Sequence, residues 1–88
     1  MASVRTLKQS INYVIGQIIE AVYLVEMTTT GQPTEATNAI LEESFTIFDN
    51  LIKKVNEKNV ADKKSHFKQI NVELENAANQ LVDKINAL

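Results

Sequence analysis

Apolar residues recur along this chain at alternating steps of three and four, which is the spacing of one face of an α-helix. The first such series consists of Val4, Leu7, Ile11, Val14, Ile18, Ala21, Val22 and Val25. The chain has only two glycines and one proline, so few residues interrupt helices, and it lacks the long alternation that marks strands. The pattern predicts an all-α protein whose first helix covers residues 4–28, with Ser3 as its N-cap.

The clearest boundary is the loop TTTGQPT at residues 28–34. Gly31 suits the left-handed residue that often ends a helix, and Pro33 cannot continue one. The second helix is therefore predicted over residues 35–57, beginning near Thr34 or Glu35. We expect its broad apolar stripe to face the core. The stripe contains Ile40, Leu41, Phe45, Ile47, Phe48, Leu51, Ile52 and Val55.

The third helix is predicted over residues 60–87, with an apolar seam that repeats every seven residues. The seam contains Val60, Phe67, Leu74, Leu81 and Leu88, joined by Ile70, Ala77, Ala78 and Ile85. No glycine or proline separates this helix from the second one, so a single fused helix over residues 34–88 is the alternative.

The phase of the apolar stripe decides between two helices and one. Steps of seven residues from Leu41 lead through Phe48 and Val55 to polar positions only. These positions are Asp62, Gln69, Asn76 and Asp83. An unbroken helix would turn its two apolar halves to different sides. We therefore expect a turn near residues 57–59, with Asn59 as the N-cap of the third helix and Asp62 at its third position.

These elements predict an up-down-up three-helix bundle. A chain of 88 residues has room for one compact core, so residues 1–88 are expected to form a single domain. Short connections make neighbouring helices antiparallel, so the first and third helices should run parallel. In length and helical pattern the chain resembles small helical bacterial proteins, and this resemblance implies no specific function.

The composition gives limited information on the compartment. The chain has no cysteine, so disulfides and thiolate chemistry are excluded. Its first residues lack the layout of a secretory signal, and no apolar stretch is long enough to predict a transmembrane segment. We therefore expect a soluble, cytoplasmic protein.

The sequence carries no motif for catalysis or for a cofactor. It has no glycine-rich phosphate loop and no metal-ligand spacing. The single histidine, His66, is expected to be exposed near the start of the third helix. Histidine phosphotransfer domains share only this histidine, because Gln69 and Ile70 stand where they have lysine and glycine. Helical chorismate mutases need several basic residues for their substrate, and Arg5 is the single arginine here. We expect no enzyme, no cofactor and no metal site.

The charged residues separate along the predicted bundle. All basic residues except Lys84 fall at one end, which we call the basic end: Arg5, Lys8, Lys53, Lys54, Lys58, Lys63, Lys64 and Lys68. Lys84 lies at the opposite, acidic end with Glu20, Glu26, Glu35, Glu42, Glu43, Glu73, Glu75 and Asp83. Helix dipoles favour cations only at the C-terminus of the second helix. The basic end is therefore a candidate anion-binding site, although surface charge also serves solubility.

A second candidate site is the apolar excess on the first helix. Its candidate interface residues are Tyr13, Ile15, Ile19 and Tyr23, although ordinary core burial is favoured, because each helix of a three-helix bundle touches two neighbours and needs a wide stripe. The leading hypothesis is a non-enzymatic interaction or structural module, whose partner is another protein or a second copy of the chain. The alternative is binding of a polyanion, such as nucleic acid or an acidic membrane surface, by the basic end. The net charge of −2 argues against a dedicated nucleic-acid protein.

Overall fold

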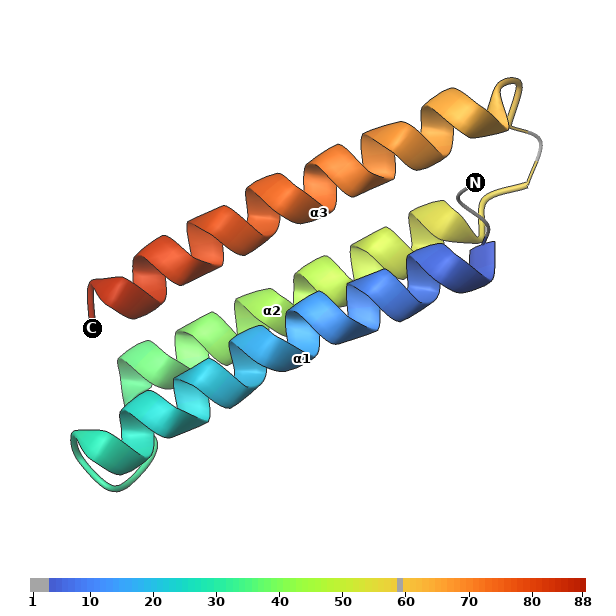
Figure 1. The fold of residues 1–88 in the computed structure, drawn as a ribbon. Helices are drawn as coiled ribbons and strands as arrows, with labels where there is room; N and C mark the ends of the chain where they lie inside the picture. Colours follow the sequence, from blue (N-terminus) through green and yellow to red (C-terminus); the bar gives the residue numbers. More distant parts are fainter. Residues whose placement is uncertain (1–3, 59) are drawn as a thin grey trace.

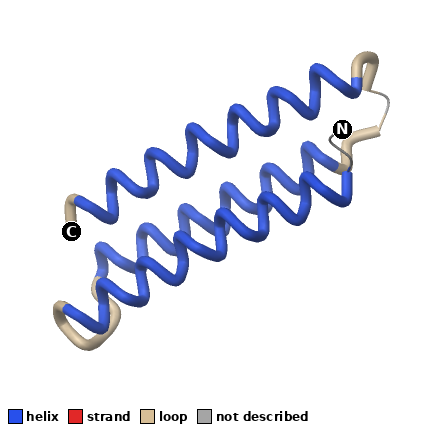
Figure 2. Tube along the Cα trace, in the orientation of Figure 1, coloured by secondary structure: helices blue, strands red, loops and turns tan. Residues whose placement is uncertain are grey.

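The chain folds into a three-helix bundle. The computed structural model describes residues 4–58 and 60–88, and this part contains three α-helices and no strand. They are α1 (Val4–Thr28), α2 (Glu35–Val55) and α3 (Lys63–Asn86). Each helix packs against both others, and α1 and α3 run in the direction opposite to α2 (Figures 1 and 2). The all-α, up-down-up prediction is confirmed, in a rod of 48 × 19 × 19 Å.

Local capping signals set the connection between α1 and α2. Gly31 has a φ of 74°, the left-handed conformation that glycine adopts without strain, and its N–H donates to the Glu26 carbonyl at 2.6 Å. The Thr34 hydroxyl accepts from the Thr37 N–H at 3.1 Å, and the Thr37 hydroxyl accepts from the Thr34 N–H at 2.9 Å. This capping box starts α2 at Glu35, within the predicted range.

The connection between α2 and α3 is longer than predicted. α2 ends at Val55 rather than at residue 57, and α3 begins at Lys63 rather than at residue 60. Asp62 is the N-cap and not the third helical residue, because its carboxylate accepts from the Ser65 N–H at 3.2 Å and the Ser65 hydroxyl at 2.9 Å. The predicted caps Ser3 and Asn59 lie outside the described residues.

The core consists of two adjoining clusters along the rod. The first contains Leu7, Ile11, Ile15, Leu51, Val55, Ile70 and Leu74. The second contains Ile18, Val22, Ile40 and Leu81. Between them Ser44 of α2 is fully buried, and its hydroxyl donates to the Ile40 carbonyl at 2.8 Å, so its burial leaves no polar group unpaired.

Three residues expected in the core are exposed instead. Phe45 follows Ser44 directly, and since one residue turns a helix by about 100°, burial of Ser44 moves Phe45 to the flank of α2. Val4 and Leu88 lie at the ends of the chain, where the neighbouring helices provide little cover.

Candidate functional site

Two ion pairs show which flank of α2 faces α3. Lys54 Nζ lies 2.6 Å from Glu73 Oε2, and Lys84 Nζ lies 2.5 Å from Glu43 Oε2. Lys54 and Glu43 therefore occupy the α3 side of α2. The opposite flank, at helical spacing from these two residues, borders α1. It carries Leu41, Phe45, Phe48 and Ile52.

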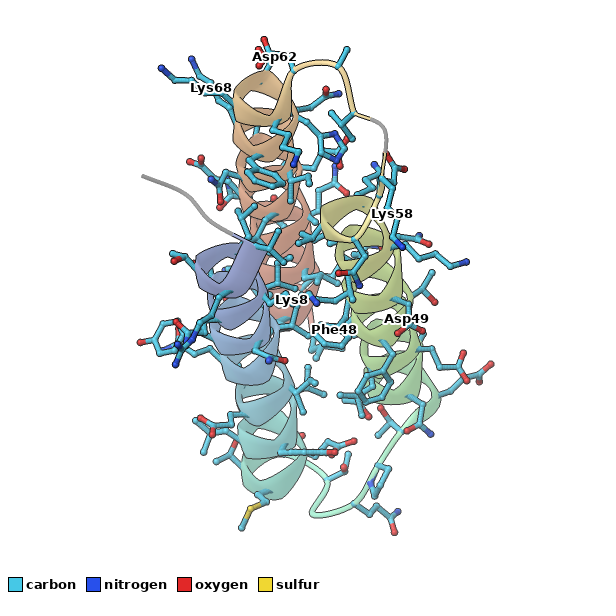
Figure 3. The ribbon with its side chains drawn as sticks, turned by 90° about the vertical axis from the view of Figure 1, so that its right-hand side faces the viewer. Lys8, Phe48, Asp49, Lys58, Asp62 and Lys68 are labelled. Atoms are coloured by element: carbon cyan, nitrogen blue, oxygen red, sulfur yellow. The ribbon has the colours of Figure 1, made fainter. Side chains whose placement is uncertain are left out.

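A buried hydrogen bond shows which flank of α1 faces α2. The carboxylate of Glu26 is buried and accepts from the Thr37 hydroxyl of α2 at 2.5 Å. Tyr23 and Ile19 precede Glu26 by one and two turns, so they lie on the same flank. The two flanks meet on the side of the bundle away from α3. Figure 3 looks onto this side, with Lys8 and Phe48 between the two helices.

We call this surface the α1/α2 face, and it is apolar. Its members are Ile19, Tyr23, Leu41, Phe45, Phe48 and Ile52. Tyr23 is 49% exposed and Phe45 is 51% exposed. The other members are half-buried against the two core clusters. Tyr23 and Phe45 are thus two half-exposed aromatic side chains that lie beside half-buried apolar residues. Such a surface is suited to an apolar partner.

The structure divides the predicted interface of α1 among three environments. Ile15 is 3% exposed within the first core cluster, so its assignment to an interface is wrong. Tyr13 is 66% exposed but points to another side of α1, where its hydroxyl accepts from the Gln17 amide at 2.8 Å. Ile19 and Tyr23 belong to the α1/α2 face. The sequence carries no signal that places Phe45 beside these two residues, because the buried position next to it is occupied by Ser44, a polar residue.

The fold brings the predicted basic residues to one end of the rod. The N-terminus of α1, the C-terminus of α2 and the N-terminus of α3 lie together there (Figure 1). Lys58 and Lys68 lie on different sides of this end (Figure 3). Lys54 is half-buried in its ion pair with Glu73, a residue that the sequence had placed at the acidic end. The remaining candidates are Arg5, Lys8, Lys53, Lys58, Lys63, Lys64 and Lys68, against the acids Glu57 and Asp62.

His66 is not the exposed residue that the sequence predicted, since its side chain is only 17% exposed. Its Nε2 lies 2.7 Å from the Lys54 carbonyl oxygen and 3.8 Å from the Glu57 carboxylate. The imidazole therefore donates to the last turn of α2, where carbonyls lack intrahelical partners, and ties the start of α3 to it.

A small, partly open pocket of about 110 Å³ surrounds this contact. It is lined by Lys54, Glu57, His66, Gln69, Ile70 and Glu73. The basic residues of the pocket, Lys54 and His66, already face the carboxylates of Glu73 and Glu57. These contacts favour a structural role for the two basic side chains. Across residues 4–58 and 60–88, no group of three or more histidine, aspartate or glutamate side chains is placed to hold a metal ion.

No protein-family model, curated protein or solved structure matches this chain. None of the helices in the described part is long and apolar enough to cross a membrane.

Proposed function

We propose that this protein is a non-enzymatic helical interaction module that binds a protein partner through the α1/α2 face. The observation that carries the proposal is the half-exposure of Tyr23 and Phe45 beside half-buried Ile19 and Phe48. Aromatic side chains on a packed apolar base are typical anchors of protein interfaces, because they bury a large area and lose little rotamer entropy. The partner is either a different protein or a second copy of the chain.

The chemistry of the face favours a protein over a charged ligand. Its centre is hydrocarbon and aromatic rings, which suit the apolar stripe of another helix. Lys8 lies nearer the basic end of this side than Phe48, and Asp49 lies at the level of Phe48 on the outer side of α2 (Figure 3). This is the usual layout of an interface with an apolar centre and a polar rim.

A pair of tyrosine variants tests the proposal. Three proteins are immobilised: the wild type, the double variant Tyr23→Asp with Phe45→Asp, and the single variant Tyr13→Asp. The proteins that each of them retains are then identified by mass spectrometry. Tyr13 is the matched control because it is an exposed tyrosine of the same helix on another side. We expect the wild type and Tyr13→Asp to retain a partner that the double variant loses. Identical retention by all three, with circular dichroism showing intact helices, would reject the α1/α2 face as an interface.

A second candidate function is polyanion binding by the basic end. Lys63 and Lys64 are the first two residues of α3, where the helix dipole disfavours cations, so an anion would relieve their repulsion. Replacing Lys58, Lys63 and Lys64 with glutamine should weaken binding of DNA, RNA or acidic vesicles, and salt should weaken wild-type binding steeply. Lys84→Gln, at the other end, is the control. Absence of binding at about 20 mM salt, where screening is weak, would refute this candidate.

A further inference from the structure

The α1/α2 face extends across the middle of the bundle. Gly16 is the middle residue of α1, and Phe45 is the middle residue of α2. Gly16 precedes Tyr23 by two turns, so both lie on the same flank of α1. A two-fold axis that crosses the face at this level would bring Phe45 of one copy against Phe45 of the other, with Ile19 and Tyr23 farther from the axis. Isologous dimers require this kind of self-complementary surface.

The charges of the rod distinguish the two possible orientations of such a pair. In a parallel pair the two basic ends would lie side by side and repel one another. In an antiparallel pair each basic end, including Arg5 and Lys8, lies beside the partner's acidic end, including Glu35 and Glu42. Complementary potentials favour the antiparallel pair and suppress the parallel one.

Gly16 adds an independent observation. Among residues 4–58 and 60–88, a Cβ at Gly16 would meet no atom of another residue within 4 Å, so no described side chain fills this space. Glycine in the interior of a helix is destabilising relative to alanine, and no contact within one chain explains its use here. Gly16 lies on this flank of α1 one turn before Ile19, and a glycine there allows the backbone of a second α1 to approach closely.

The side of the rod that carries this face has room for a specific dimer. With principal extents of 48 and 19 Å, one side of the rod projects to roughly 900 Å², comparable to the roughly 800 Å² per partner of a standard interface. We propose, building on the function proposed above, that the occupant of the α1/α2 face is a second copy of this chain, docked antiparallel about a two-fold axis. In this dimer α1 lies against the partner's α1, with Gly16 beside the partner's Gly16.

Sedimentation from micromolar to millimolar concentration tests whether the dimer forms through this face. The set comprises the wild type, Phe45→Asp, Gly16→Gln and the control Tyr13→Asp. We expect the wild type and the control to dimerise, and each of the other variants to weaken dimerisation by about a hundredfold or more, because each change alters both copies at the interface centre. Gly16→Gln is informative because glutamine favours helix and meets open space, so its monomer should unfold at a higher temperature.

Cysteine cross-linking tests the orientation, because the chain has no cysteine of its own. Gly16→Cys should form a disulfide-linked dimer on mild oxidation. Arg5→Cys alone should not, since the two copies of residue 5 lie at opposite ends of an antiparallel dimer. Arg5→Cys mixed with Met27→Cys should form a cross-linked pair, because residue 5 of one copy lies opposite residue 27 of the other.

Three results would overturn the inference. They are a strict monomer at millimolar concentration, a dimer that Phe45→Asp and Gly16→Gln leave intact, and efficient cross-linking of Arg5→Cys with itself. A strict monomer that still retains a different protein through Tyr23 and Phe45 would overturn the dimer and leave the proposed function standing. A monomer whose retention of other proteins is unchanged by these substitutions would reject both.

Discussion

Substitution of Thr37 by valine should destabilise the bundle more than its modest change in shape suggests. The Thr37 hydroxyl is buried, and two of its hydrogen bonds matter here: it donates to the Glu26 carboxylate at 2.5 Å and accepts from the Thr34 N–H at 2.9 Å. Valine keeps the volume of the side chain and removes both hydrogen bonds. Half of the capping box is lost, and the buried carboxylate loses its donor.

The magnitude follows from these two losses. Loss of a capping interaction costs about 1 kcal/mol. An unsatisfied buried acceptor costs a further ~1–3 kcal/mol. We therefore expect Thr37→Val to lower the free energy of unfolding by about 2–4 kcal/mol. Adding Glu26→Met should restore part of this loss, because replacing both partners by apolar groups removes the unpaired acceptor.

Urea unfolding followed by circular dichroism measures these values for wild type, both single variants and the double variant. The double-mutant cycle then gives the coupling between Thr37 and Glu26. Thr37→Ser is the matched control, because it retains the hydroxyl and should keep most of the stability. A loss below about 0.5 kcal/mol for Thr37→Val, or strictly additive effects of the two substitutions, would show that the hydrogen bond does not stabilise this end of the bundle.

Three further predictions concern the rest of the bundle. Leu74→Ala should lower the free energy of unfolding by about 2–5 kcal/mol, because it opens a cavity in the first core cluster, and unchanged urea unfolding would contradict its place there. His66→Ala should remove the hydrogen bond to the Lys54 carbonyl and cost about 1 kcal/mol, with faster amide exchange at the end of α2 than in the wild type. The backbone N–H of Ser65, followed by its hydroxyl, holds the pKa of Asp62 below its usual 3.8. A lowered pKa in the folded state means that this cap stabilises α3 above about pH 4 and is lost as the pH falls further. The protection factor of the Ser65 amide, which is the ratio of its intrinsic to its observed exchange rate, should therefore fall on acidification in the wild type and change much less in Asp62→Asn.

Local chemistry in the sequence determined the helices and the first loop. The apolar period, Gly31 and Thr34 act within a few residues of one another, so their effects on the backbone need no distant partner. The bounds of α1 and the start of α2 were predicted correctly for this reason. The start of α3 was not, because Asn59 and Asp62 are both good N-cap residues and no glycine or proline distinguishes between them.

Only the tertiary structure decided which apolar and charged residues remain accessible. A wide apolar stripe has two edges, and packing against the neighbouring helices decides which edge is buried. This packing buried Ile15 of α1 and Ser44 of α2 and left Phe45 of α2 half-exposed. Likewise, Lys54 meets Glu73 only through the alignment of α2 against α3, which a sequence of local signals does not specify. The helices therefore follow from interactions between neighbours in the chain, whereas the α1/α2 face and the free charges follow from contacts between residues far apart in it.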